Sequence, residues 1–164
     1  MQAMERNTSL DEVDRRILSI LQKDGRITNV KLAARVGLSA PSVLERVRKL
    51  EERGLIGSYV ALLDREKLGF GLMAFVLVSL ASHRLTNIDQ FRGEVLRQSE
   101  VLECHHVAGE GDFLLKVVAR DIGAYRDFLV SSLTSMKGVQ RVNTMIVFET
   151  LKGETSLPVD TSGA

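Results

Sequence analysis

The feature that most constrains this fold is a pair of helix-start signals, eleven residues apart, within residues 26–49. Thr28 and Ser39 are residue types that cap helix N-termini, because their side-chain oxygen can accept a hydrogen bond from a free backbone N–H group. An apolar residue stands just before each cap and another stands four positions after it, a spacing that lets the two side chains pack together. These apolar pairs are Ile27 with Leu32 and Leu38 with Val43. Gly37 can adopt the left-handed conformation that ends a helix, so the pattern predicts two short helices joined by a tight turn at residues 37–39.

A further helix is expected before this pair. Apolar residues recur at helical spacing between residues 10 and 23, Asp11 is a suitable N-cap, and Gly25 should end the helix. The last helix runs from Ser39 to about Arg53 and accepts Pro41 in its first turn, where a missing N–H is harmless. The last two helices and the tight turn between them form a helix-turn-helix. In this motif the helix after the turn, here the one that starts at Ser39, enters the major groove of DNA.

Charge is distributed unevenly along the 164 residues, whose formal net charge is +1. Residues 26–49 hold six basic side chains and one acidic side chain, a local net charge of +5. Residues 1–60 hold 11 basic and 8 acidic side chains, net +3, whereas residues 61–164 hold 11 and 13, net −2. A polyanionic partner such as double-stranded DNA would therefore meet the first part of the chain.

Candidate DNA-contacting side chains lie on the last two of these helices. They are Asn29 and Arg35 on the first of the two, and Ser39, Ser42, Arg46, Arg48 and Lys49 on the second. A helix N-terminus and its hydroxyl groups suit phosphates, Arg46 can reach a guanine edge with two hydrogen bonds, and Asn29 and Arg35 are expected to touch the DNA backbone. The alternative is an ordinary solvated helix with ion pairs between Glu45 and Lys49 and between Arg48 and Glu52.

The pattern divides the chain into two domains of an α+β protein. Residues 10–63 form the helix-turn-helix domain, winged-helix-like with a strand at 55–63; residues 64–71 are a linker, 72–150 a second domain, and 151–164 a loosely held polar tail. In the second domain, strands are expected at 72–80, 101–107, 113–119 and 139–149, and helices at 87–98 and 121–135. The order βαββαβ is the ferredoxin-like arrangement.

Two strands of the second domain are apolar on both faces. In residues 72–80, Met73, Phe75 and Leu77 alternate with Ala74, Val76, Val78 and Leu80, and the second half of 139–149 shows the same pattern. A strand that is apolar on both faces expects cover on both, yet two helices can cover only one face of a four-stranded sheet. We therefore expect a homo-oligomer in which another copy of the chain supplies the second cover.

The chain resembles the Lrp/AsnC transcription regulators. The resemblance rests on LDEVDRRILSILQKDGRITNVKLAARVGLS, on SVLERVRKLEERGLIGSYVALLD and on the later VLECHHVAGEGDFLLKV, and it is closest to the leucine-responsive members. It implies an N-terminal DNA-binding domain and a C-terminal domain that binds small molecules, often amino acids, and forms dimers and higher rings up to octamers. The function implied is a sequence-specific regulator whose assembly or DNA affinity responds to an effector such as leucine.

The resemblance also implies an effector site in the loop Ala108-Gly109-Glu110-Gly111-Asp112. Asp112 can accept from the effector's ammonium group, while amides around Gly109 and Gly111 can donate to its carboxylate. Many family members carry an aromatic residue where this chain has Gly111, which predicts room for a bulkier ligand. The family's pocket lies between dimers, so Thr144 and Ile146 are further candidates to line it. Without the resemblance, Gly109 and Asp112 would be ordinary hairpin-turn residues.

Other functions have less support in the sequence. Neighbouring side chains on a strand point to opposite faces, so Glu103, Cys104, His105 and His106 do not form a metal site, and no catalytic motif or cofactor motif is present. The single cysteine, the polar N-terminus and the lack of a long apolar run favour a soluble cytoplasmic protein without membrane attachment. The alternatives are an enzyme resembling sirohaem decarboxylases, which act on a tetrapyrrole, and a DNA-architectural protein without an effector.

Overall fold

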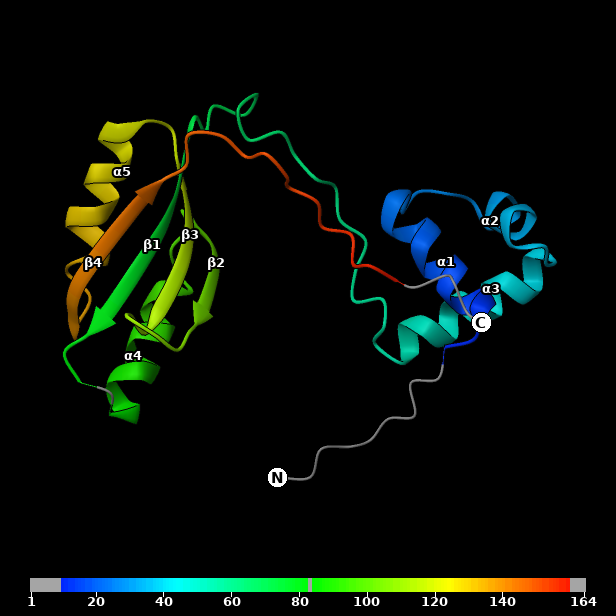
Figure 1. Ribbon diagram of the computed structural model, residues 1–164, viewed down its shortest axis with the longest axis horizontal. Coiled ribbons are helices and arrows are strands. Elements are labelled where there is room, and N and C mark those ends of the chain that lie inside the picture. The colour runs from blue at the N-terminus through cyan, green and yellow to red at the C-terminus, as the bar shows by residue number, and fades with distance from the viewer. Residues whose placement is uncertain (1–9, 83, 160–164) are drawn as a thin grey trace. The chain divides into compact units, whose positions relative to one another are not determined.

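The computed structural model describes residues 10–82 and 84–159, which form two compact units (Figure 1). Of the described residues, 10–62 and 152–159 belong to one unit, and the part between residues 63 and 151 belongs to the other. The described chain has no helix long and apolar enough to cross a membrane.

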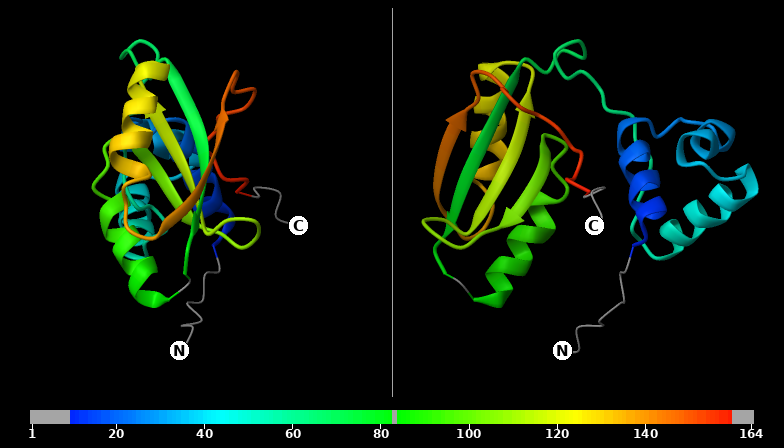
Figure 2. Two further views of the ribbon diagram at one scale, coloured as in Figure 1. Left: turned by 90° about the vertical axis from the view of Figure 1, so that its left-hand side faces the viewer. Right: turned by 45° about the vertical axis from the view of Figure 1, so that its right-hand side comes forward.

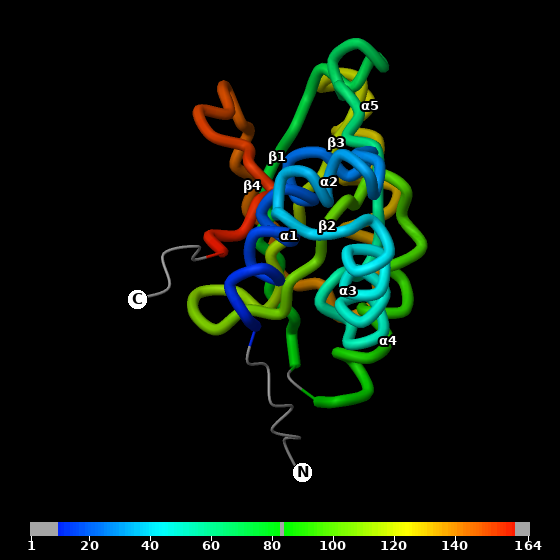
Figure 3. The backbone as a smooth tube through the Cα atoms, turned by 90° about the vertical axis from the view of Figure 1, so that its right-hand side faces the viewer, coloured from blue at the N-terminus to red at the C-terminus, as the bar shows by residue number. Residues whose placement is uncertain are grey.

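The first unit consists of three helices: α1 (Glu12–Lys23), α2 (Asn29–Val36) and α3 (Ala40–Glu52). Figure 3 labels all three and colours them from blue to cyan. Each N-cap is the predicted one, because Asp11, Thr28 and Ser39 each accept a hydrogen bond from the backbone N–H three residues later. The predicted left-handed conformation of Gly37, with φ 74°, ends α2. These local signals produce the expected helix-turn-helix.

A shared apolar core fixes the three helices against one another. Ile17 of α1, Leu32 of α2, and Val43 and Leu50 of α3 are at most 1% exposed. The predicted inward face of α3 is therefore confirmed, and the remaining faces of α3 are left for polar side chains. Burial of such side chains contributes about 1.5–3 kcal/mol each, which holds α3 in a fixed orientation despite the short turn that precedes it.

The strand predicted at residues 55–63 does not form. Residues 57–64 follow an extended path with neither helix nor strand pairing, and Val60, Leu62 and Leu63 are each more than 70% exposed. An extended segment becomes a strand only when a neighbour supplies backbone hydrogen bonds. Thr155 and Leu157 lie beside this segment, but the described chain shows no backbone hydrogen bond between either residue and the segment.

The described part of the tail is held more firmly than predicted. The side chain of Gln22 on α1 donates to the carbonyl of Leu157 and accepts from its N–H, at 3.2 and 2.6 Å. A primary amide can make both bonds to one residue because its donor and acceptor lie side by side. Residues 152–159 thus belong to the helical unit, and the predicted tail beyond residue 159 lies outside the described residues.

The second unit is a four-stranded antiparallel sheet with helices on one face (Figure 2). The elements are β1 (Leu72–Leu80), α4 (Leu85–Val95), β2 (Val101–His106), β3 (Phe113–Ala119), α5 (Ile122–Phe128), which continues into the π-helical turn η1 (Leu129–Leu133), and β4 (Val139–Ile146). The strand order is β2-β3-β1-β4. This arrangement confirms the predicted ferredoxin-like order, and no element end differs from its predicted position by more than three residues.

The two faces of β1 meet different surroundings. Ala74, Val76 and Val78 are fully buried beneath the helices, together with Phe91 of α4 and Leu115 of β3. On the opposite face, Phe75 pairs with Met145 and Leu77 pairs with Asn143 across β1 and β4. Phe75 and Leu77 are only partly covered and Met145 is 46% exposed. We call this opposite surface the open face of the sheet.

Candidate functional site

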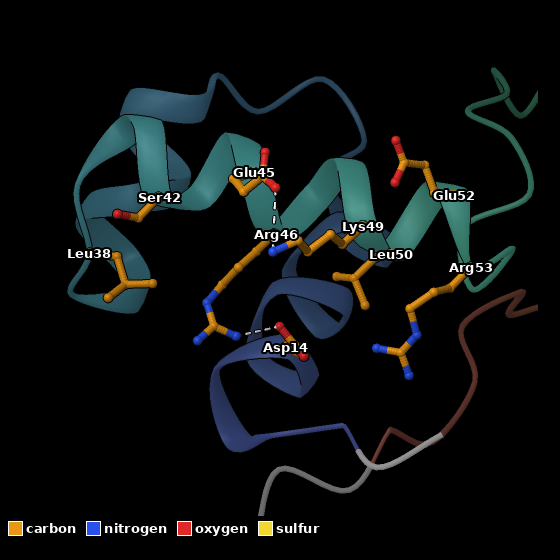
Figure 4. A pocket seen from close by; sticks show the side chains of 9 residues that line it. All are labelled: Asp14, Leu38, Ser42, Glu45, Arg46, Lys49, Leu50, Glu52 and Arg53. Atoms are coloured by element: carbon orange, nitrogen blue, oxygen red, sulfur yellow. Dashed lines mark hydrogen bonds and ion pairs between the residues drawn. The ribbon is translucent and has the colours of Figure 1, made fainter. Parts of the chain in front are cut away.

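A groove runs along α3 and carries three of the seven residues predicted to contact DNA (Figure 4). Ser42, Arg46, Lys49 and Arg53 line it, and their spacings of four, three and four residues place them on one side of the helix. The acids Asp14, Glu45 and Glu52 also line the groove, together with Leu38 and Leu50. Arg53 was missed in the sequence analysis, although its helical spacing from Lys49 was visible there.

The two serines at the start of α3 are bonded to one another, and Ser42 alone of the two lines the groove. Ser39 Oγ accepts from the backbone N–H of Ser42 at 3.3 Å, and the two hydroxyl groups lie 2.8 Å apart. Both residues are exposed. A hydroxyl group that accepts one hydrogen bond still has further capacity, so both serines remain able to bond with a phosphate oxygen at the start of α3.

Arg46 is engaged by two carboxylates of the first helix. Its Nη1 donates to Asp11 Oδ2 at 2.6 Å and to Asp14 Oδ1 at 2.7 Å. Asp11 Oδ1 meanwhile caps α1 by accepting from the N–H of Asp14. That backbone bond is the main reason why the pKa of Asp11 is lowered, with the bond from Arg46 adding to it. The bonds to both carboxylates raise the pKa of Arg46.

The other two basic residues of α3 form the ion pairs expected for an ordinary solvated helix. Arg48 Nε lies 2.8 Å from Glu52 and Lys49 Nζ lies 3.4 Å from Glu45. All four side chains are more than half exposed, so these pairs contribute little and are easily exchanged for other anions. Arg48 does not line the groove. The local charge of +5, which already includes Glu45, is therefore balanced in part by Glu52 of α3 and by Asp11 and Asp14 at the start of α1.

The two remaining candidates lie on α2. Asn29 is the first residue of α2 and Arg35 is near its end, and both are exposed. The backbone carbonyl of Arg35 accepts from Arg16 of α1 at 3.1 Å, which leaves the Arg35 side chain unaffected. Neither residue lines the groove along α3.

In the other unit, the loop between β2 and β3 is anchored at both ends of its turn. Asp112 donates its N–H to Val78, accepts from the N–H of Val107, and accepts from the N–H of Leu80 through its carboxylate at 2.7 Å. Between these anchors, the backbone N–H groups of residues 108–110 donate to no group in the described chain. Gly109 has φ 139°, a backbone conformation that other residues rarely adopt.

Gly111 does not leave space for a bulkier ligand, so that expectation was wrong. A β-carbon at residue 111 would lie 2.6 Å from Cγ of Leu77 and 2.8 Å from its Cδ1. Gly111 is buried, and its backbone does not need a glycine conformation. The glycine is explained by the Leu77 side chain, which fills the place of the missing side chain on the open face.

Thr144 and Ile146 do not lie beside this loop within one chain. They pair with Val76 and Ala74, whereas the loop adjoins the other end of β1. Thr144 also bonds with the Tyr125 hydroxyl at 2.5 Å on the helix-covered face. Arg141 is nearer to the loop and was missed, because only the strand register reveals that its guanidinium donates to the Glu110 carbonyl at 3.3 Å.

The side chains of β2 separate as their alternation predicted. Glu103 lies 3.2 Å from His105 and 2.8 Å from Lys116, whereas His106 stacks on Phe113 on the other face. The described residues contain no group of three or more potential ligands that could hold a metal ion.

Comparison with known proteins identifies both units. Residues 10–56 match a winged helix-turn-helix DNA-binding domain, and residues 73–157 match the Lrp/AsnC ligand binding domain. The chain belongs to the Lrp/AsnC family. The leucine-responsive regulatory protein of Rhizobium meliloti (strain 1021) is 46% identical over 143 residues, which cover 87% of this chain and 92% of that protein.

Solved Lrp/AsnC structures share the fold. A transcriptional regulator from Neisseria meningitidis in complex with L-Met is 38% identical, with a TM-score of 0.89 over 93% of this chain and 98% of that chain. The feast or famine regulatory protein from M. tuberculosis, complexed with L-methionine, is 32% identical, with a TM-score of 0.83 over 91% of this chain and 99% of that chain. This Lrp/AsnC protein is a DNA-binding regulator with a ligand-binding domain. The comparisons give no support to a tetrapyrrole-processing enzyme.

Proposed function

We propose that this regulator binds specific DNA sites through α3 and that an apolar α-amino acid, with leucine as the first candidate, controls its assembly or its DNA affinity. The single observation that carries the proposal is the presence of the helix-turn-helix groove and the Lrp/AsnC ligand-binding domain in one chain. Relatives named leucine-responsive regulatory protein, and the two solved regulators that hold methionine, support an amino-acid effector.

On the DNA side, the proposal assigns different tasks to the two ends of α3. Ser39 and Ser42, at the N-terminus, bond with phosphates, while Lys49 and Arg53 neutralise phosphate charge farther along the groove. The exposed pair between Lys49 and Glu45 is weak enough to be replaced by a phosphate. Arg46 contacts a guanine edge. Arg48, Asn29 and Arg35 complete the predicted set at its periphery, as contacts to the DNA backbone.

On the effector side, the loop offers partners for both ends of an amino acid. The N–H groups of residues 108–110 donate to the carboxylate, as successive backbone amides do in other anion sites. Asp112 accepts from the ammonium group. Arg141 is a second donor for the carboxylate, because it already reaches the Glu110 carbonyl. Thr144 and Ile146 join the site only if a second copy brings them to the loop.

Assembly follows from the open face of the sheet. Phe75, Leu77 and Met145 place apolar surface there, and a second copy covers it in the proposed dimer, with an octamer as the full assembly by family resemblance. A symmetric dimer presents two α3 helices, so its DNA site is nearly palindromic, with half-sites about one helical turn, roughly 34 Å, apart.

Titration calorimetry with a panel of amino acids tests the effector site on the parent, Asp112→Asn and Glu110→Gln proteins. Asparagine keeps an oxygen that can accept from Leu80 but loses the charge that faces the ammonium group. A charge-assisted hydrogen bond contributes about 1.5–3 kcal/mol, so Asp112→Asn should weaken binding by roughly ten- to a hundredfold.

Glu110→Gln is the matched control, because it removes an acid from the same loop. The bonds to Glu110 in the described chain go to its backbone carbonyl and not to its side chain. This variant should bind the effector as the parent does. Equal affinities of the parent and Asp112→Asn proteins would remove Asp112 from the site. No heat with any amino acid would refute an amino-acid effector, and the DNA affinity of the same samples shows separately whether the regulator function stands.

A further inference from the structure

Asp11 and Asp14 hold one particular atom of the Arg46 side chain. Both carboxylates accept from Nη1, at 2.6 and 2.7 Å, although a guanidinium has donors on three nitrogens. Nε and Nη2 donate to no group in the described chain. The carboxylates therefore occupy one corner of the guanidinium, and the Nε–Nη2 edge of this groove-lining side chain donates to no described residue. Figure 4 shows the bond to Asp14.

The two carboxylates are themselves held in place. Asp11 is the N-cap of α1, and its Oδ1 bonds with the N–H of Asp14 while its Oδ2 faces Arg46. The Asp14 side chain is only 14% exposed and lies in the first turn of α1. One turn later, Ile17 is fully buried in the core. The position of the guanidinium is thus set by a different helix from the one that carries it.

An arginine that recognises guanine uses two neighbouring N–H donors in one plane, and the Nε–Nη2 edge provides such a pair. A long, freely rotating side chain loses rotamer freedom when it forms that contact, whereas a side chain that is already fixed loses less. Contacts that orient a recognising group therefore raise discrimination between sequences without touching DNA.

We propose that Asp11 and Asp14 are specificity-determining positioning residues, which aim the Nε–Nη2 edge of Arg46 at a base. The inference rests on the proposed DNA-binding function and deepens it. It also explains why acids lie beside a surface that binds a polyanion. Repulsion from phosphates acts on every DNA sequence alike, whereas aiming of Arg46 acts only where a suitable base is present.

The two roles of an acid predict different effects of its removal on the affinity for the preferred DNA site. Removing an acid that serves no orienting role should strengthen binding to all DNA, because a repulsive charge is lost. Removing Asp14 should strengthen or preserve binding to arbitrary DNA but weaken binding to the preferred site. The specificity ratio is the dissociation constant for arbitrary DNA divided by that for the preferred site. It isolates the orienting effect, since the general charge effect cancels in the ratio.

The test measures fluorescence anisotropy of two duplexes with the full-length protein at one salt concentration. The first duplex is the one that the parent protein selects from random DNA, and the second is a shuffled duplex of the same length and composition. A bidentate arginine–guanine contact contributes about 5- to 150-fold in discrimination. Asp14→Asn should therefore lower the ratio by fivefold or more, and Glu45→Gln, which removes an acid of the same groove that pairs with Lys49, should leave the ratio unchanged.

Two further variants make the test independent of folding. Asp11→Asn keeps a good helix cap while it loses the charge that faces Arg46, so it should lower the ratio in the same way. In an Arg46→Gln background, Asp14→Asn should cause no further loss, because the residue it positions is gone. Thermal unfolding of each variant confirms that α1 still packs on α3.

A loss of less than fivefold in the ratio for both Asp14→Asn and Asp11→Asn would overturn the proposal, as would a full loss that persists in the Arg46→Gln background. These outcomes leave the proposed function intact as long as the parent prefers its selected duplex. If the parent shows no preference between the duplexes, the proposed sequence-specific function fails, and the positioning role fails with it.

Discussion

Gly111→Ala tests whether the Leu77 side chain is the reason for a glycine in the effector loop. The new β-carbon would lie 2.6 Å from Cγ and 2.8 Å from Cδ1 of Leu77. Carbon atoms in contact are normally about 3.5–4.0 Å apart, so the overlap is roughly 1 Å. The backbone at Gly111 does not adopt the left-handed conformation that other residues avoid, so the substitution adds a steric conflict and no backbone strain.

The expected magnitude combines two opposing effects. Forcing an extra carbon into a packed site costs about 1–3 kcal/mol. Alanine also restricts the unfolded chain more than glycine does, which returns about 0.4–1 kcal/mol. Gly111→Ala should therefore lower the free energy of unfolding by about 1–2 kcal/mol. In a Leu77→Ala background the conflict disappears, so the same substitution should be neutral or slightly stabilising.

The parent protein, Gly111→Ala, Leu77→Ala and the double variant form a double-mutant cycle. Urea unfolding of these four proteins, at one fixed protein concentration, measures the coupling between the two residues. Gly109→Ala is the contrasting control, because its β-carbon would meet no atom within 4 Å but its φ is 139°. Its cost should be the same with leucine or alanine at residue 77. If Gly111→Ala costs the same in both backgrounds, the steric explanation is wrong.

Two more predictions concern pH and assembly. Because the pKa of Asp11 is lowered, chiefly by the Asp14 N–H, the stability it contributes is complete above the unfolded pKa of about 4 and is lost as pH falls through the folded value. Asp11→Asn should therefore flatten the acid side of the stability profile in urea unfolding, and an unchanged slope would assign the acid sensitivity to other groups. Phe75→Asp, on the open face, should yield monomers in light scattering with the sheet signal in circular dichroism retained, whereas Val76→Asp, in the core, should unfold the domain. A Phe75→Asp protein with the parent's mass would place the interface elsewhere.

The helices and strands could be predicted from the sequence because their signals are local. Asp11, Thr28, Ser39 and Gly37 act on residues within one turn of themselves, and each does so in the structure. The alternation of residues 72–80 likewise identified two apolar faces. It could not tell which face the helices cover, because that depends on the hand of the connections between strands.

The partners of Arg46 could not be predicted from its neighbourhood in sequence. Asp11 and Asp14 are 35 and 32 residues away, and a charge count over residues 26–49 leaves both out. The reason for Gly111 was hidden in the same way, since Leu77 reaches it only through the pairing of β1 with β3. In each case the decisive contact joins distant segments, which no helical or strand period reveals.

The bonds between Gln22 and Leu157 have a consequence for the order in which the protein is made. A chain leaves the ribosome from its N-terminus, so the three helices emerge before the sheet does. Residues 152–159, which complete the helical unit, emerge only after all of β4. A fragment that ends at residue 62 therefore lacks part of its own DNA-binding unit. A fusion or truncation at residues 152–159, near the C-terminus, alters the helical unit that contains α3.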